Sequence, residues 1–368
     1  MSQFLNFGNS SDGPLSITTP TTHAPIDSSC SGTGGTTSLT ATNVSFTAGQ
    51  FILIHQSRGA NAGYWEMNKI ASYTAGTITT SFPLTLTYQD GGVSQAQVIV
   101  MPQYSGITIS SILTAKAWNE NVGGIIPFLC NGCTNISGSI TANGKGYLGA
   151  ASVSGIGLAG GQGEGTSGPR GTISTAANGN GGGGGYTSGY DNASGGGGGG
   201  YANNGTDGAP GQAAPGGTGG ISTGNTSLTT MSIGGGGGTG GSGRYGATIS
   251  GAGANGGGII LIYSQKIIVS GGIYCNGDNG GIVPTGAAGG GGGGAGGSIF
   301  LKGQELILGT SLITADKGTG GFSNAGVGGA GSIGRIRIET CSRTGSTNPA
   351  ASESIGGYTF CGSLAAIL

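Results

Sequence analysis

Two cysteines separated by two residues, Cys130 and Cys133, form the most specific chemical spacing in the chain. A structural zinc site would need a second such pair or a matched pair of histidines. The only histidines are His23 and His55, which are far apart in the sequence. A redox-active pair would begin a helix, and no helix is predicted here. We therefore expect no metal site and interpret this spacing as a turn that holds either a strained disulfide or two free thiols.

The chain contains 6 cysteines, and an even number permits disulfides outside the cytosol. Cys341 and Cys361 flank a short C-terminal segment, and we favour them as one bridge. Cys130 and Cys133 are the other disulfide candidates. The alternative is that the cysteines are buried free thiols, which pack as small apolar side chains.

The acidic side chains do not form a pattern typical of catalysis. Glycoside cleavage needs two carboxylates held close together, and no two acidic residues pair when the repeated segments are aligned. A serine nucleophile at a strand-to-helix turn is not predicted either. No Gly-Lys-Ser or Gly-Lys-Thr follows a glycine run to bind phosphate. We therefore predict that the protein is not an enzyme and uses no cofactor.

Binding is better supported than catalysis, because two short segments interrupt the glycine tracts with tyrosine, asparagine and aspartate. Aromatic rings stack on sugars or apolar patches, and asparagine and aspartate supply directional hydrogen bonds. The alternative is that the tyrosines clamp glycine layers together as local packing. The candidate receptor- or glycan-binding residues are Tyr186, Tyr190, Asp191, Asn192, Tyr201, Asn203, Asn204 and Asp207.

The composition limits the elements that can position these residues. The chain has 90 glycines, but only 7 % of its residues are charged, which argues against simple disorder. The net charge is −1 with no basic stripe, so we expect no nucleic-acid partner. No apolar run is long enough to span a membrane. The segment Met1–Gly8 lacks the features of a secretory signal, so we expect either another route out of the cell or a different original start.

Residues 1–107 read as an N-terminal β domain for attachment or assembly. Short segments rich in threonine, isoleucine, valine and aromatic residues alternate with glycine, aspartate and serine turns, a spacing typical of a sandwich or small barrel. We expect a β-sandwich-like domain. The predicted strands are Ser38–Phe46, Phe51–Gln56, Tyr64–Tyr73, Thr77–Ser81, Leu84–Tyr88 and Ala96–Met101.

Residues 108–340 contain repeated short strands, which predict a glycine-rich β-solenoid or β-helix. One element recurs at 137–146, 270–279 and 311–318, and another at 257–262, 297–301 and 334–338. Long glycine tracts lie around 158–257. They are either extended strands packed as polyglycine II, backbone against backbone, or flexible loops. We favour ordered packing where apolar strands bracket a tract, and expect residues 341–368 to form a C-terminal cap.

Several segments resemble a widespread set of glycine-rich proteins, labelled tail fibre or tail adhesin in phages and surface protein in bacteria. The similarity spans most of the chain and includes the glycine runs. It is carried by Leu5–Gly8, Ala96–Tyr104, Leu113–Asn119, Ile140–Gly146 and Gly334–Glu339.

The resemblance implies a structural or host-binding role in a virion tail, with glycine-rich loops presented to a host surface glycan or outer-membrane protein. The alternative is a self-assembling filament or matrix protein of a cell surface or the extracellular space. Either function predicts association with copies of the chain or with partner subunits, because solenoid ends leave strand edges open. The expected location is a virion tail or a cell exterior.

Overall fold

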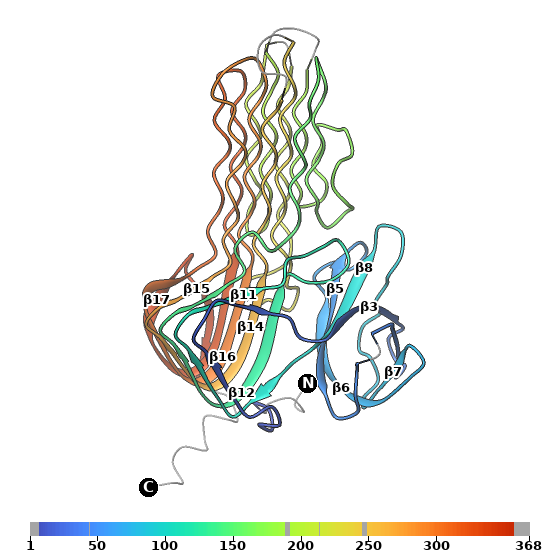
Figure 1. Cartoon of the computed structure of the whole chain (residues 1–368), viewed down its shortest axis with the longest axis vertical. Helices are drawn as coiled ribbons and strands as arrows, with labels where there is room; N and C mark the ends of the chain where they lie inside the picture. Colours follow the sequence, from blue (N-terminus) through green and yellow to red (C-terminus); the bar gives the residue numbers. More distant parts are fainter. Residues whose placement is uncertain (1–6, 44, 188–191, 213, 245–248, 357–368) are drawn as a thin grey trace.

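The computed structural model describes residues 7–43, 45–187, 192–212, 214–244 and 249–356. The described residues contain strands and no helix, which confirms the all-β prediction. Figure 1 shows three parts: an antiparallel barrel, a parallel sheet beside it, and a bundle of extended glycine-rich chains that rises from the parallel sheet. We call the barrel and the parallel sheet together the base. The glycine bundle comprises the described residues within 143–258, 275–297 and 315–334.

The barrel is closed by two strands, β3 and β6, that change partner along their length. The first half of β3 pairs with β8, and its second half pairs with β4. The expected β-sandwich is therefore a closed barrel, and the predicted strand Leu84–Tyr88 contributes only an isolated bridge at Tyr88. The barrel strands, in the order β3-β4-β7-β6-β5-β8, are β3 (Asp27–Gly32), β4 (Ser38–Ala41), β7 (Thr77–Thr80), β6 (Trp65–Thr74), β5 (Phe51–Arg58) and β8 (Gln95–Val100).

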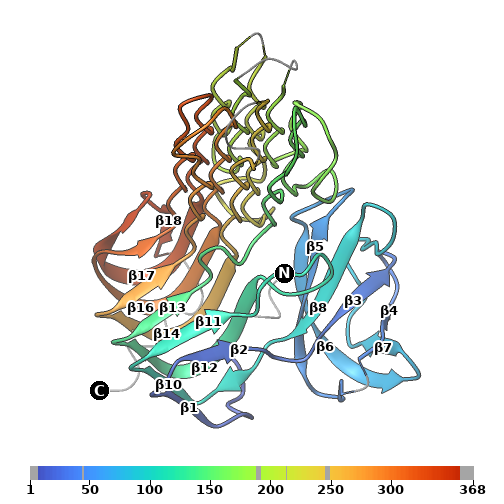
Figure 2. The ribbon, with the colours of Figure 1, turned by 45° about the horizontal axis from the view of Figure 1, so that its top comes forward.

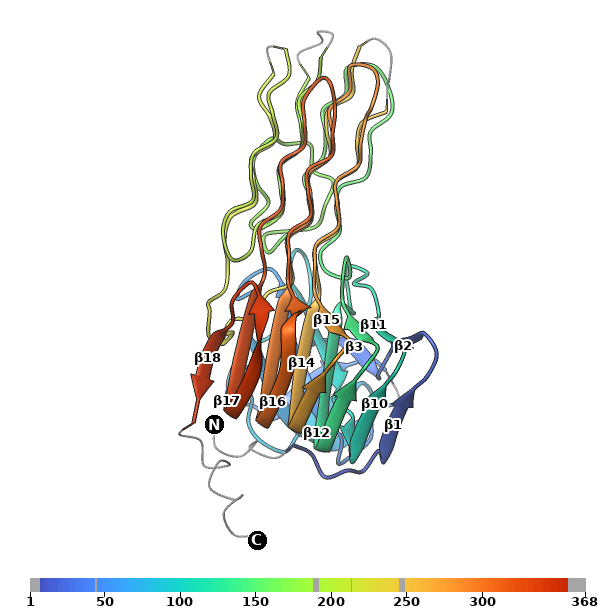
Figure 3. The same cartoon turned by 90° about the vertical axis from the view of Figure 1, so that its left-hand side faces the viewer.

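The parallel sheet is built largely by strands that stack in chain order (Figures 2 and 3). Its first two strands precede the barrel in sequence, so the sheet crosses the expected boundary at 107. The predicted C-terminal cap begins at residue 341, inside strand β17. Its strands are β1 (Pro14–Ile17), β2 (Thr21–His23), β9 (Gln103–Tyr104), β10 (Gly106–Ile109), β11 (Ile112–Ala115), β12 (Ile125–Ile136), β13 (Ser139–Thr141), β14 (Ile259–Val269), β15 (Gly272–Tyr274), β16 (Ser298–Thr314), β17 (Arg335–Asn348) and β18 (Ser352–Ile355).

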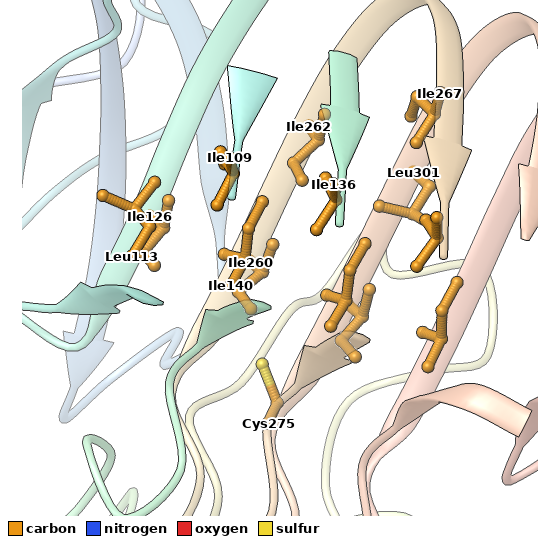
Figure 4. Close-up of a cluster of buried hydrophobic side chains, with 14 of the residues drawn as sticks. Ile109, Leu113, Ile126, Ile136, Ile140, Ile260, Ile262, Ile267, Cys275 and Leu301 are labelled. Carbon is orange, nitrogen blue, oxygen red and sulfur yellow. The ribbon is translucent and has the colours of Figure 1, made fainter. Parts of the chain in front are cut away.

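The repeated sequence elements lie in register within this sheet. Ile140 pairs with Ile273, which pairs with Ile313. Copies of the second element align Ile260 with Ile299, and Ile299 in turn pairs with Ile336. The sheet runs from β1 out to β16 and back to β2, so its two halves face each other across one apolar core (Figure 4). Each repeat therefore buries its isoleucines against its neighbours.

A second apolar cluster joins the two bodies of the base. The outward faces of β12, β14 and β16 contribute Leu129, Leu261 and Phe300, and the barrel contributes Leu53 and Ile99. These side chains are nearly or fully buried, so the barrel is fixed against the sheet by the hydrophobic effect.

In the interior of the glycine bundle a chain segment donates backbone hydrogen bonds to three neighbours in turn, so that every third residue donates to the same neighbour. A period of three is expected of extended helices with three residues per turn, the geometry of polyproline II. Segment 289–297 shows the pattern: Gly289, Gly292 and Ala295 donate to Gly241, Gly238 and Gly235; Gly290, Gly293 and Gly296 to Gly326, Gly329 and Ser332; and Gly291, Gly294 and Gly297 to Gly281, Asp278 and Cys275.

Close approach of the backbones makes glycine necessary in the bundle interior. A Cβ atom at Gly238 would overlap the carbonyl of Gly183, and one at Gly292 would overlap that of Gly197. Both clashes are with main-chain atoms, which cannot turn aside as a flexible side chain can. The length of the tracts thus reflects packing on all sides and not only tight corners.

Candidate functional site

The bundle is held to the base by a buried polar junction. Glu164 of the bundle is fully buried and pairs with Arg58 of β5. Its other oxygen accepts hydrogen bonds from Trp118 Nε1 at 2.9 Å and from the backbone nitrogen of Leu148 at 3.1 Å. Burial is the largest influence and raises the pKa of the Glu164 carboxyl, while these donors and Arg58 oppose it. The ion pair thus joins an element of the barrel to an element of the bundle.

Beside it, His55 and Ser57 have the residue types of a catalytic pair but no access to substrate. His55 Nε2 lies 2.7 Å from the carbonyl of Met231 and Nδ1 lies 2.9 Å from Ser57 Oγ. The hydroxyl also accepts a hydrogen bond from Gln97 at 2.8 Å. All three side chains are buried, and burial lowers the pKa of His55 to about 4. The pair therefore acts as a neutral structural link between barrel and bundle.

Each segment of chain that enters the bundle, here called an excursion, begins and ends at the base. The chain therefore reverses direction at the far end of the bundle. Residues 275–297 leave from β15 and return as β16, and residues 315–334 leave β16 and return as β17. The longer excursion between β13 and β14 leaves the base past Tyr147 and returns to it at Glu164 and Tyr201, and all three side chains are buried. We call the far segments the distal turns: the described residues 153–158, 186–187, 192–193, 241–244, 249–250, 282–288 and 322–327.

The distal turns gather exposed apolar side chains. Ile156, Ile282 and Phe322 expose 68 %, 67 % and 55 % of their surface. Two of these turns touch, since the backbone nitrogen of Val283 donates to the carbonyl of Phe322 at 2.8 Å. Among the described residues of these turns, Arg244 is the only charged one. The other exposed apolar members are Leu158, Tyr186, Ile249 and Val327.

The structure separates the predicted binding residues into two groups. Tyr186 and Asn192 are exposed on a distal turn, whereas Tyr190 and Asp191 lie outside the described residues. Tyr201 is fully buried at the base, where its hydroxyl lies 2.6 Å from Ser298 Oγ. Its ring is also covered by the Arg335 guanidinium at 5.4 Å. Tyr201 is thus a packing residue, the alternative that the sequence left open.

Asn203, Asn204 and Asp207 follow Tyr201 on the exposed side of the bundle. Asn204 Oδ1 accepts a hydrogen bond from the backbone nitrogen of Ser222 at 2.8 Å, and Asp207 Oδ1 accepts one from Gly219 at 2.7 Å. The Asn204 carboxamide and the Asp207 carboxylate therefore link neighbouring chains of the bundle by hydrogen bonds. The sequence could have revealed the apolar distal turns only if the glycine runs had been recognised as straight chains.

The cysteines divide between free thiols and a disulfide. Cys130 and Cys133 are free thiols, the second of the two alternatives for this spacing, and so are not a disulfide: Cys130 is buried in the core of the parallel sheet and Cys133 is exposed. Cys341 is disulfide-bonded, and its predicted partner Cys361 lies outside the described residues. No group of three or more His, Cys, Asp or Glu side chains suited to a metal ion occurs in the described ranges.

The sequence matches no model of a known protein family, and no curated protein is significantly similar to it. Over the described part of the chain, no helix is long and apolar enough to cross a membrane.

Proposed function

We propose that the protein is an attachment protein of a virion tail, a tail fibre or tip adhesin, that presents the distal turns to a host surface. The apolar character of the distal turns carries this proposal. Contiguous exposed apolar surface marks interaction sites in soluble proteins, and Ile282 and Phe322 lie on adjoining turns. Since these turns lack carboxylates among their described residues, an apolar protein surface such as that of an outer-membrane protein suits them better than a charged glycan.

The architecture suits a stiff spacer. We interpret the parallel strands as the coils of a β-solenoid and the bundle as its return segments packed as polyglycine II. Backbone hydrogen bonds in three directions cross-link the segments, so that the bundle resists bending without a side-chain core. The base would then face the particle, and the location would be the virion tail.

Binding to bacterial cells tests the proposal. Labelled full-length protein is applied to a panel of Gram-negative strains, and a strain that binds is used to compare variants. I282D and F322D should abolish cell binding, because a charge would be buried in the contact. The matched control is I173D, which alters an equally exposed isoleucine (72 % exposed) outside the distal turns. Equal loss in the control, or full binding by both distal variants, would refute the assignment of the site.

A self-assembling filament is the second candidate, favoured by the ends of the parallel sheet. Among the described strands, β1 and β2 at one end and β18 at the other each have a single neighbour. Open strand edges can pair with another chain. Negative-stain images of the purified protein decide between the two: indefinite filaments formed by this chain alone would support the filament, and discrete particles would support the adhesin.

A further inference from the structure

An open depression of about 510 Å³ lies at the side of the molecule, where the barrel meets the bundle. We call it the side pocket. Its volume falls within the range of small-ligand sites, and it is separate from the distal turns. It is lined by Gly59, Ala60, Asn61, Ala62, Val93, Thr166, Ser167 and Thr223.

The barrel wall of the side pocket is held in one conformation. Gly59, Asn61 and Gly63 adopt left-handed backbone angles, with φ of 88°, 62° and 90°. Gly59 donates its N–H to the carbonyl of Thr166 at 2.9 Å, which ties the loop to the bundle. A Cβ atom at Gly59 would overlap Ser94, so the loop is packed closely against Ser94. A ligand would therefore meet a wall that is already formed, which lowers the entropic cost of binding.

None of the lining residues is ionisable. Arg58, which precedes Gly59 in the chain, pairs with Glu164 in the buried junction. Arg58 is further occupied by the carbonyl of Val93, which its Nε meets at 3.0 Å. A charged ligand would thus lose part of its hydration without gaining an opposite charge from any lining residue. The side pocket consequently favours an uncharged ligand.

The lining offers the groups that recognise a polyol. Thr166, Ser167 and Thr223 carry hydroxyls that both donate and accept, and the Asn61 amide does the same with separate atoms. Val93, 52 % exposed, adds an apolar surface against which the C–H face of a sugar ring packs. From this combination we propose that the side pocket binds a neutral saccharide. The proposal stands independently of the function of the distal turns.

Ligand-observed NMR on the full-length protein tests this inference. The neutral probes are maltotriose and N,N′,N″-triacetylchitotriose, and the charged control is a trigalacturonate. At least one neutral probe should bind, and the trigalacturonate should bind at least about tenfold more weakly. The probes are used at 10 mM, a concentration above a dissociation constant of about 1 mM. The inference is overturned if neither neutral probe binds, or if the trigalacturonate binds as tightly as the neutral probes.

Variants locate the binding. N61G keeps the left-handed backbone and removes the amide, and S167A removes an exposed hydroxyl; each should weaken binding about fivefold. I173D, which alters an exposed isoleucine outside both the side pocket and the distal turns, is the matched control and should bind the sugar normally. If N61G lowers the melting temperature, S167A alone decides the outcome. Unchanged affinity in the folded variants would place the sugar elsewhere and refute the side pocket.

Discussion

Replacing Gly238 with alanine would measure how strongly the bundle depends on bare backbone. Gly238 donates its N–H to Gly197 at 2.9 Å and accepts from Gly292 at 2.8 Å. An added methyl group would overlap the carbonyl carbon and oxygen of Gly183. Two chains must therefore separate, and the hydrogen bonds on either side are strained or lost.

The expected magnitude follows from three contributions. Overpacking a dense interior costs about 1–3 kcal/mol, and each weakened hydrogen bond costs about 0.5–1.5 kcal/mol. Alanine restricts the unfolded chain and returns about 0.4–1 kcal/mol. With two weakened hydrogen bonds, these contributions add up to a loss of about 1–6 kcal/mol in the free energy of unfolding of G238A, centred on about 3 kcal/mol.

Gly168 provides a matched control within the same bundle. Its Cβ atom would have no neighbour closer than 3.5 Å, and its φ lies outside the left-handed region. Only the unfolded-state contribution applies, so G168A should be unchanged or more stable by up to about 1 kcal/mol.

Urea unfolding followed by tryptophan fluorescence reports the free energies, because Trp118 lies in the junction beside Tyr147. Hydrogen exchange with mass spectrometry then locates the effect: in G238A the amides of the bundle should lose protection while those of the barrel keep it. Equal stability and equal protection in G238A and G168A would show that the backbones are not packed as described.

Three further predictions concern the junction, pH and the thiols. E164Q leaves Arg58 charged and buried, so it should cost about 3 kcal/mol of unfolding free energy, whereas the double variant R58M/E164L should cost less; equal losses would contradict the reasoning. Because the pKa of His55 falls from its ordinary 6.5 to about 4 in the folded protein, its stabilising effect is complete above pH 6.5 and is lost as the pH falls towards 4. Between pH 6.5 and 4 the free energy of unfolding of H55Q should therefore fall by about 3 kcal/mol less than that of the wild type. Equal falls in the two proteins would count against this reasoning. Cys133 is exposed and burial raises the pKa of its thiol, so native labelling should be slow at pH 7, faster at pH 9 and lost in C133S.

Sequence patterns were sufficient to predict the class of the fold and the repeat. The β-branched runs and glycine turns specify strands, and the recurring Ile140, Ile273 and Ile313 predicted neighbours that the sheet indeed pairs. Periodic apolar residues carry this information locally, because each strand shows its buried face within a few residues. Closure of the barrel was missed, since whether β3 meets β8 depends on residues that are distant in sequence.

The candidate site shows the same division. The sequence singled out Tyr186 and Tyr201 alike, and both interrupt glycine tracts. The fold exposes Tyr186 on a distal turn and buries Tyr201 against Ser298. Composition could not separate them, because burial depends on where along a straight chain each residue falls.

By itself the sequence determined an all-β chain with repeated strands, few charges and glycine runs too long for turns. Only the tertiary structure decided that these runs pack in three directions, that the apolar turns meet at one end, and that Arg58 and Glu164 join bundle to barrel. The physical reason is that glycine carries no side chain to indicate its neighbours. Its partners are backbone groups, identical in every residue, and the ends of the surrounding segments alone set which chains lie side by side.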